Sequence, residues 1–301
     1  PKEAFTSCAP KLSDALEKYC RLKGADRAAQ FFKAAKLNVS YVIQHLGDRP
    51  LDAYSSSNAA SFRDWLVNKN LSSSSIKRIF STIRAVFTLT IQEEGLNCNN
   101  AFAKTFLPSD ERPKRKSISP EDIKRVQKIC LDIADERRLL VALISDTGMR
   151  LSEALGLVWS DVKLDHKYPH ISLIPHSWRP LKTVGSKRLI PLVGAAYEAI
   201  KIMHRHRSTS FLFNSYTDET GCKGNSCSAT LNKWLKHYVS EAVIHSFRHS
   251  FRDRLRNAGV QSEIIDQLGG WSKQSVGQGY GDGFDLRHLL GNLERISFDM
   301  L

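Results

Sequence analysis

A proline- and charge-rich stretch, residues 102–118 (FAKTFLPSDERPKRKSI), most constrains how this 301-residue chain can fold. Its prolines, its mixed charges and the run Lys114-Arg115-Lys116 make it unsuited to a hydrophobic core and suited to an extended connection. The chain is long enough for each side of this stretch to bury a core of its own. We therefore expect two domains, residues 1–101 and 119–301, joined by a basic linker over 102–118.

Apolar residues at helical spacing dominate the first domain. Patterns of this kind predict one helix that ends near Gly24, a second over about residues 27–46, and a third capped by Ser57 or Asn58. The clearest stripe predicts a fourth helix and consists of Ile76, Ile79, Phe80, Ile83, Val86, Phe87 and Ile91. The first domain is therefore expected to be helical.

Two cations, Lys77 and Arg84, share another face of the fourth helix. They are either solvated surface residues or lie along a phosphate backbone, and the linker cations Lys114, Arg115 and Lys116 have the same two interpretations. We name all five as candidate DNA-binding residues.

The second domain begins with a strong helix start, Ser119-Pro120-Glu121-Asp122, which combines an N-cap, a first-turn proline and acidic residues. Most of the following chain has helical periodicity. The runs HISLI (170–174) and RLIPL (188–192) have strand character and flank a polar turn, which predicts a hairpin. The fold class is therefore mainly α with a small antiparallel sheet in the second domain.

The charge of the chain restricts its partners. The formal net charge is +13 and the isoelectric point is near 9.5, which favours a polyanionic partner. No apolar run reaches the roughly 20 residues of a membrane span, and no signal peptide is recognisable at the start. Nucleic acid is thus the expected partner, and a membrane is not.

The six cysteines are scattered along the chain, which favours a reducing cytoplasm over a disulfide framework. Four residues separate Cys222 from Cys227, but no second pair with metal-ligand spacing accompanies them. The sequence also contains no Walker loop and no acidic cluster for Mg²⁺. We therefore expect neither a metal nor another cofactor.

The stretch from His245 to Tyr280 is the strongest candidate for chemistry. It concentrates histidines and arginines in a short run and ends at a tyrosine among glycines. Such a pattern suits a phosphate site with a phenol nucleophile. Arg150 and Lys182 are further cations, although a surface ion pair with Glu153 and a solvated turn lysine are the simpler explanations for these two.

Four motifs together resemble the tyrosine recombinases, also called phage integrases. They are TGMRLSEALGL around Arg150, LKTVGSKRLIPL around Lys182, HSFRHSFRDRL from His245, and LGGW followed by Tyr280. The motifs cover the second domain in order, and the first domain looks like the family's core-binding (SAM-like) domain. The resemblance implies two domains that form a C-shaped clamp on DNA.

The resemblance also implies roles for individual residues. Arg150 and Arg248 would bind the non-bridging oxygens of the scissile phosphate, and Tyr280 would attack the phosphorus to form a 3′-phosphotyrosine link. His245 would accept the phenol proton, and Lys182 would protonate the leaving 5′ oxygen.

Supporting roles follow from the same comparison. Trp271 stands where many members have histidine, and its indole N–H can donate to phosphate but cannot shuttle a proton. Glu153 would orient Arg150, and His249 would be structural. Because the hairpin turn varies in length within the family, Lys187 competes with Lys182 as the catalytic lysine.

The expected function is site-specific recombination of double-stranded DNA, for integration or excision of a prophage, genomic island or transposon. The family acts as a homotetramer on synapsed DNA and is monomeric when free, and the helical pattern at 284–298 would dock on a neighbouring subunit. DNA-bending accessory or directionality factors are possible partners. The expected location of this bacterial or phage-encoded protein is the cytoplasm, in association with the nucleoid.

Two other functions stay open at this point: a type IB-like topoisomerase and a DNA-binding protein without catalysis. The chain opens on Pro1, and no arm-binding domain of the kind found in many phage integrases is recognisable before residue 11.

Overall fold

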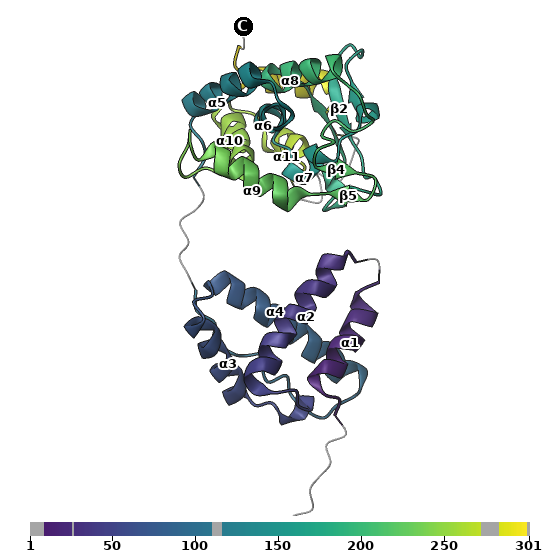
Figure 1. The fold of residues 1–301 in the computed structure, drawn as a ribbon, viewed down its shortest axis with the longest axis vertical. Coiled ribbons are helices and arrows are strands. Elements are labelled where there is room, and N and C mark those ends of the chain that lie inside the picture. The colour runs from purple at the N-terminus through teal and green to yellow at the C-terminus, as the bar shows by residue number, and fades with distance from the viewer. Residues whose placement is uncertain (1–8, 26, 110–115, 272–282, 300–301) are drawn as a thin grey trace, which may run out of the picture. The chain divides into compact units, whose positions relative to one another are not determined.

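The protein forms two compact units, residues 1–113 and 114–301 (Figure 1). The computed structural model describes residues 9–25, 27–109, 116–271 and 283–299. Each unit has its own hydrophobic core. The chain is mostly helical with small antiparallel sheets, which confirms the predicted fold class.

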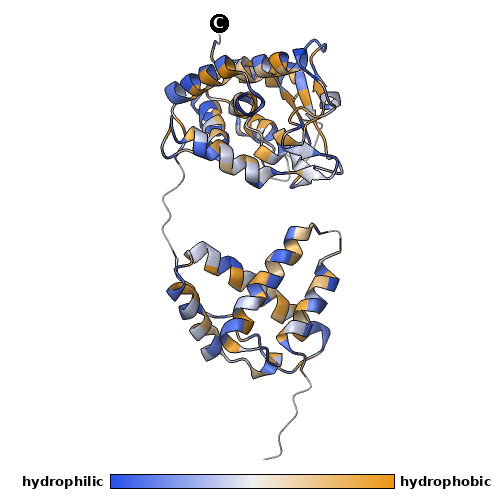
Figure 2. Cartoon of the chain, viewed as in Figure 1, coloured by the Kyte–Doolittle hydropathy of each residue, from blue (hydrophilic) through white to orange (hydrophobic). Residues whose placement is uncertain are grey.

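The first unit is helical, as expected. It contains α1 (Leu12–Lys23), α2 (Ala29–Leu46), the short 3-10 helix η1 (Leu51–Ala53), α3 (Ser56–Asn68) and α4 (Ser73–Glu93). The predicted stripe of α4 is buried from Ile76 to Phe87, and Figure 2 shows the helices carrying both apolar and polar sides. Burial of this stripe against the other helices holds the unit together.

Helix α3 begins earlier than predicted. Its cap is Ser55 rather than Ser57 or Asn58: the Ser55 hydroxyl accepts from the Asn58 backbone N–H at 3.2 Å. The Asn58 side chain in return accepts from the Ser55 backbone N–H at 3.0 Å. Asn58 thus completes a reciprocal cap three residues inside the helix, which explains why it resembled a cap itself.

Part of the predicted linker belongs to the first unit. Phe102 is fully buried there, with its ring centroid 5.0 Å from that of Phe87. Arg84 donates from Nε to the Phe102 carbonyl at 2.8 Å and from Nη2 to the Thr105 carbonyl at 3.0 Å. Burial of one aromatic ring outweighs the prolines and charges that follow it. The structure therefore places residues 102–105 within this unit.

The second unit surrounds one buried helix, α6, seen end-on in Figure 1. Ser119 caps α5 as predicted, since its hydroxyl accepts from the Asp122 backbone N–H at 3.1 Å. The helices of this unit are α5 (Pro120–Ile133), α6 (Glu136–Thr147), α7 (Leu151–Leu155), α8 (Gly194–Arg205), α9 (Gly224–Leu235), α10 (Ile244–Asn257), α11 (Ser262–Gly269) and α12 (Leu286–Glu294), with short 3-10 helices η2 (Trp159–Asp161) and η3 (Val184–Ser186).

The predicted hairpin is confirmed. Strands β2 (His170–Leu173) and β3 (Arg188–Pro191) pair antiparallel, with Leu173 opposite Arg188. The sequence did not predict the short strand β1 (Val162–Lys163), which extends this sheet, or the separate pair β4 (Thr217–Asp218) and β5 (Gly221–Cys222). Each of these strands has only two residues, too few for a period-two pattern to be recognised.

Helix α12 packs on its own unit. Leu289 and Leu293 are buried in a cluster with residues of α10 and α11, such as Phe251 and Leu268. The docking of residues 284–298 on a neighbouring subunit stays a prediction. Among the described residues, none of the helices combines the length and apolar character that a membrane crossing requires.

Candidate active site

A tight turn between α6 and α7 positions Arg150. Helix α6 ends at Gly148, whose φ of 59° lies in the left-handed region that favours glycine. A Cβ on Gly148 would lie 2.4 Å from the ring of Phe251 on α10, so the turn packs directly on that helix. Arg150 then forms the N-cap of α7. The turn therefore fixes the backbone position from which the Arg150 side chain extends.

Glu153 holds Arg150 from within the first turn of α7. Its Oε2 accepts from the Arg150 backbone N–H at 3.0 Å, and its Oε1 accepts from Nη1 of the same residue. Burial alone raises the pKa of this carboxyl, but the charge of Arg188 and the hydrogen bonds from both arginines outweigh it and lower the pKa below its ordinary value of 4.5. Glu153 is thus a carboxylate at neutral pH and binds Arg150 through both of its oxygens, while its role in orienting Arg150 stays a prediction.

The structure adds Arg188, which we did not single out from the sequence. Its side chain is 2% exposed, and its Nη2 lies 3.0 Å from Oε2 of Glu153. The alternation of side chains along β3 indicates that Arg188 points inward. Leu189 is 40% exposed and Ile190 is buried, and Arg188 lies on the same face as Ile190. A buried acid stabilises an inward arginine, and only the folded chain shows that Glu153 is the acid beside Arg188.

Arg248 lies next to this pair, on α10. Its Nη1 donates to the Gly148 carbonyl at 2.6 Å, while its Nη2 is buried without a hydrogen-bond partner among the described residues. Burial, together with the nearby charges of Arg150 and Arg188, lowers the pKa of Arg248 to about 9. A buried guanidinium with a free donor and cationic neighbours is a ready site for an anion.

The indole ring of Trp271 packs against the guanidinium of Arg248. The guanidinium carbons of Arg248 and Arg252 lie 4.3 and 4.6 Å from the centroid of its ring. Arg252 is also paired with Asp266 at 3.0 Å. The ring of Trp271 is therefore a stacking surface for two arginines one helical turn apart, and the predicted donation of its N–H to phosphate stays a prediction.

The two candidate histidines lie on the exposed side of α10. His245 and His249 are one turn apart, with ring centroids 5.2 Å apart. Because Arg248 is on the same helix, His245 and Arg248 are held by one rigid element. Their assigned roles stay predictions.

The candidate lysines lie between β2 and β3. Lys182 and Lys187 are both exposed, and between them Ser186 is fully buried. The Ser186 hydroxyl accepts from Nη1 of Arg150 at 3.2 Å and lies 3.0 Å from the hydroxyl of Thr183. The segment that carries both lysines is thus fastened to Arg150, and both remain candidates for the proton donor.

The nucleophile candidate Tyr280 lies outside the described residues, as do Lys114 and Arg115. Among the other DNA-binding candidates, Lys77 is exposed on α4 and Lys116 forms an exposed ion pair with Glu241 at 3.0 Å. Arg84 donates to the carbonyls of Phe102 and Thr105, as described above. Its DNA contact stays a prediction, and such a contact would compete with these hydrogen bonds.

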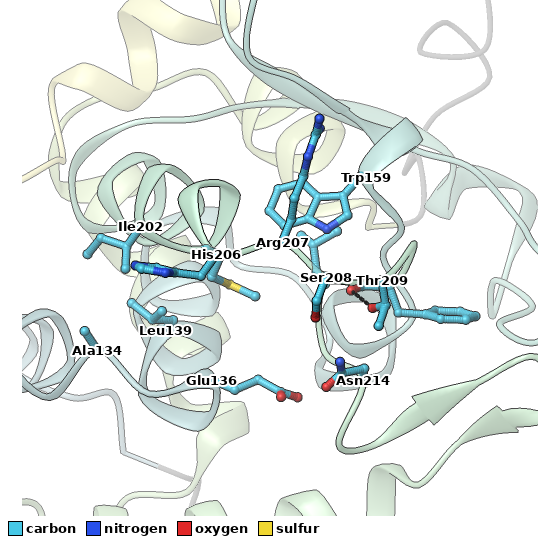
Figure 3. Close-up of a pocket in the computed structure, with 13 residues that line it drawn as sticks. Ala134, Glu136, Leu139, Trp159, Ile202, His206, Arg207, Ser208, Thr209 and Asn214 are labelled. Carbon is cyan, nitrogen blue, oxygen red and sulfur yellow. Dashed lines mark hydrogen bonds between the residues drawn. The ribbon is translucent and has the colours of Figure 1, made fainter.

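A separate pocket lies elsewhere in the second unit (Figure 3). It is formed around Leu139 of α6, Ile202 of α8 and the following residues 206–214, with Trp159 on one side. Glu136 at its edge already accepts from the backbone N–H and hydroxyl of Ser215, at 3.1 and 2.8 Å. None of the predicted site residues lines this pocket, so it is not part of the arginine site.

Known proteins with similar sequences and folds were found. Residues 116–285 match the model of the phage integrase family. The tyrosine recombinase XerC of Rhodospirillum centenum is 24% identical, over 96% of this chain and 88% of the relative.

Two solved structures share the fold. The Tn1549 transposon integrase in complex with circular intermediate DNA has a TM-score of 0.71 at 18% identity, over 94% of this chain and 99% of that one. A lambda integrase tetramer bound to a Holliday junction has a TM-score of 0.68 at 16% identity, over 93% and 82%.

The second unit brings Arg150, Arg188 and Arg248 together around Glu153, and the matching relatives are DNA strand-transferring enzymes. The chain belongs to the phage integrase family, the tyrosine recombinases, because the family model matches more than half of its residues. This confirms the resemblance read from the four motifs and the enzyme class that it implied.

Proposed function

We propose that this protein catalyses site-specific recombination by cutting and rejoining DNA through a covalent bond to Tyr280. The observation that carries the proposal is the buried Nη2 of Arg248, which lacks a partner among the described residues and lies in a cluster with Arg150 and Arg188. A non-bridging phosphate oxygen is a strong acceptor for such a donor.

The reaction is a transesterification at phosphorus. The phenol oxygen of Tyr280 forms a bond to phosphorus, its proton passes to His245, and the bond to the 5′ oxygen breaks as Lys182, or Lys187 in its place, protonates that oxygen. Arg150 and Arg248 balance the charge that develops on the non-bridging oxygens. The reverse sequence with a new 5′ hydroxyl joins the strands again.

One phosphoester bond forms for each that breaks. The phosphotyrosine therefore keeps the bond energy of the original strand, and rejoining needs no nucleotide hydrolysis. The ring of Trp271 holds Arg248 against the phosphate. The carboxylate of Glu153 holds Arg150 against the same phosphate.

We further propose that the protein acts on synapsed double-stranded DNA as a homotetramer and is monomeric when free. Support comes from the lambda integrase tetramer on a Holliday junction, which shares the fold. The likeness to a transposon integrase supports a mobile element as the substrate. Lys77, Arg84 and the linker cations Lys114, Arg115 and Lys116 would contact the DNA backbone.

The proposal is tested on the DNA that flanks the encoding gene. Wild-type protein should form an adduct that resists detergent and is trapped on substrates nicked next to the cleavage site. Tyr280→Phe should bind the same DNA and form no adduct. Tyr238→Phe, which keeps the ring contact of that residue with Trp234, is the matched control and should behave as wild type.

Two results would point to the alternative functions. Adduct formation by Tyr280→Phe would contradict the proposal, because another residue would then be the nucleophile. No adduct with wild type would favour a DNA-binding protein without this chemistry. Relaxation of supercoiled plasmid without the mapped site would favour a topoisomerase.

A further inference from the structure

Arg188 connects three segments behind the phosphate site. Its Nε donates to the Leu268 carbonyl at the end of α11 at 2.8 Å, and its Nη1 donates to the Ser186 carbonyl at 2.8 Å. Its Nη2 donates to Oε2 of Glu153 on α7 at 3.0 Å. Each nitrogen of one planar group thus reaches a different segment, which the single ammonium of a lysine cannot reproduce.

The carboxylate of Glu153 is shared between Arg188 and Arg150. Oε2 accepts from Arg188 and from the Arg150 backbone, and Oε1 accepts from the Arg150 side chain. Both oxygens are therefore committed, and the carboxylate is held between the two arginines. Arg188 is thereby linked through Glu153 to the Arg150 guanidinium.

The turn after α11 depends on the same group. Gly270 has φ 61°, and a Cβ on it would lie 2.7 Å from Nη1 of Arg188. Its carbonyl lies 3.4 Å from Nη2 of Arg150, and Trp271 follows directly. Arg188 thus packs against the backbone that presents the stacking ring to Arg248.

We propose that Arg188 is a positioning residue for the phosphate-binding pair: it fixes Arg150 through Glu153 and fixes Trp271, and with it Arg248, through the turn after α11. The proposal rests on the function proposed above and assigns Arg188 no contact with the substrate. Because misplacement of a binding group by about 1 Å can lower a rate roughly 100-fold, its effect belongs in the chemical step.

The first test compares Arg188→Met and Arg188→Lys with wild type on the nicked substrate. DNA affinity should change by less than about threefold, because phosphate contacts along the DNA are untouched. The single-turnover rate of adduct formation should fall roughly 100-fold in Arg188→Met. Arg188→Lys keeps the positive charge but cannot donate hydrogen bonds in the three directions of the guanidinium. Its rate of adduct formation should therefore lie between those of wild type and Arg188→Met.

A second arm separates positioning from loss of fold. Arg254→Met removes another buried arginine, paired with Asp146 at 2.9 Å, that contacts none of the groups around Glu153. It should lower thermal stability without a comparable loss of rate in the folded fraction. If Arg188→Met does not fold, Arg188→Lys decides alone: a wild-type rate would overturn the proposal, and a reduced rate at unchanged affinity would support it.

A third arm asks whether Arg188 acts through Glu153. Glu153→Gln and the double variant with Arg188→Met should show non-additive losses, with the double close to the slower single variant. Additive losses would contradict the proposal. The cations that face Glu153 are Arg150 and Arg188 in contact, with Arg179 and Arg248 further away.

Removal of Arg188 should also raise the pKa of Glu153, so that the adduct rate of Arg188→Met decreases toward acidic pH relative to wild type. This extra acidic decrease should vanish in the double variant, and its persistence there would count against the proposal. Failure of the proposed function is recognised separately, because wild type itself would then form no adduct.

Discussion

The guanidinium of Arg248 is stacked on the indole of Trp271, with its central carbon 4.3 Å from the ring centroid. Behind this stack Arg248 is 4% exposed and has no carboxylate among its described hydrogen-bond partners. A buried cation held by a ring and one carbonyl is incompletely compensated. The free protein therefore carries an energetic cost at the position where the phosphate would bind.

Replacement of Arg248 by methionine should remove that cost. We expect the free energy of unfolding of the free protein to stay unchanged or rise by up to ~2 kcal/mol, while adduct formation is abolished. The pKa of Arg248 is lowered to about 9, so the penalty is fully present below pH 9 and is relieved as the pH rises above 9 toward the higher ordinary pKa of arginine. Denaturant titration at pH 7 measures this, and a clear loss of stability in Arg248→Met would contradict it.

Inorganic phosphate should stabilise the wild-type protein through the same site. An anion that binds only the folded state raises the free energy of unfolding by ~2.7 kcal/mol at 100 times its dissociation constant. The melting temperature should thus rise with phosphate at constant ionic strength, and the rise should be smaller in Arg248→Met. An equal response of the two proteins would show that phosphate acts elsewhere.

Substitutions of Trp271 should separate its ring from its N–H group. Trp271→Phe keeps a stacking surface and should retain stability within about 1 kcal/mol, with a loss of about tenfold in adduct rate if the N–H donates to phosphate. Trp271→Ala loses both and should be slower and less stable. A wild-type rate in Trp271→Phe would show that only the ring matters. Thermal melts and single-turnover assays on the same samples give both quantities.

Glu153 should make stability depend on acidic pH. Its pKa in the folded protein is lowered by Arg188 and Arg150 against the effect of burial, so its contribution is present above about pH 4.5 and is lost as the pH falls through the folded-state pKa. At pH 7, Glu153→Gln should be less stable than wild type by about 3 kcal/mol. This difference should shrink toward pH 3, and a constant difference would argue against an ionised Glu153.

The cysteines should react in an order set by burial. Burial raises the pKa of Cys227 to about 12 and also raises that of Cys130, so both thiols should resist alkylation while the protein is folded. The half-buried Cys20 and Cys98 should react first. Mass spectrometry of alkylated peptides, in a Cys8→Ser background, gives the order. Early labelling of Cys130 would show that the core of the second unit opens.

The sequence predicted what depends on local pattern. The stripe from Ile76 to Phe87, the cap at Ser119 and the hairpin around Lys182 follow from periods and capping rules that act within a few residues. The family motifs made Arg150 and Arg248 site candidates, because each lies in a short run of characteristic residues, and their roles stay predictions.

What the sequence missed depends on contacts between distant segments. Arg188 is explained by Glu153, 35 residues earlier, and by a carbonyl of Leu268, 80 residues later. The place of Phe102 in the first core depends on the aromatic rings of Tyr54 and Phe87. The spacing of residues along the chain does not show which distant residues will be in contact. Local composition therefore predicted a linker at Phe102 and gave Arg188 no role beyond its place in a strand.

The turn at Gly148 has a consequence for how Arg150 and Arg248, the two arginines proposed to bind phosphate, behave as a pair. Its carbonyl accepts from Arg248, and two residues later the same backbone begins α7 with Arg150. Both side chains are therefore tied to one short stretch of backbone. A shift of this turn would move Arg150 and Arg248 together.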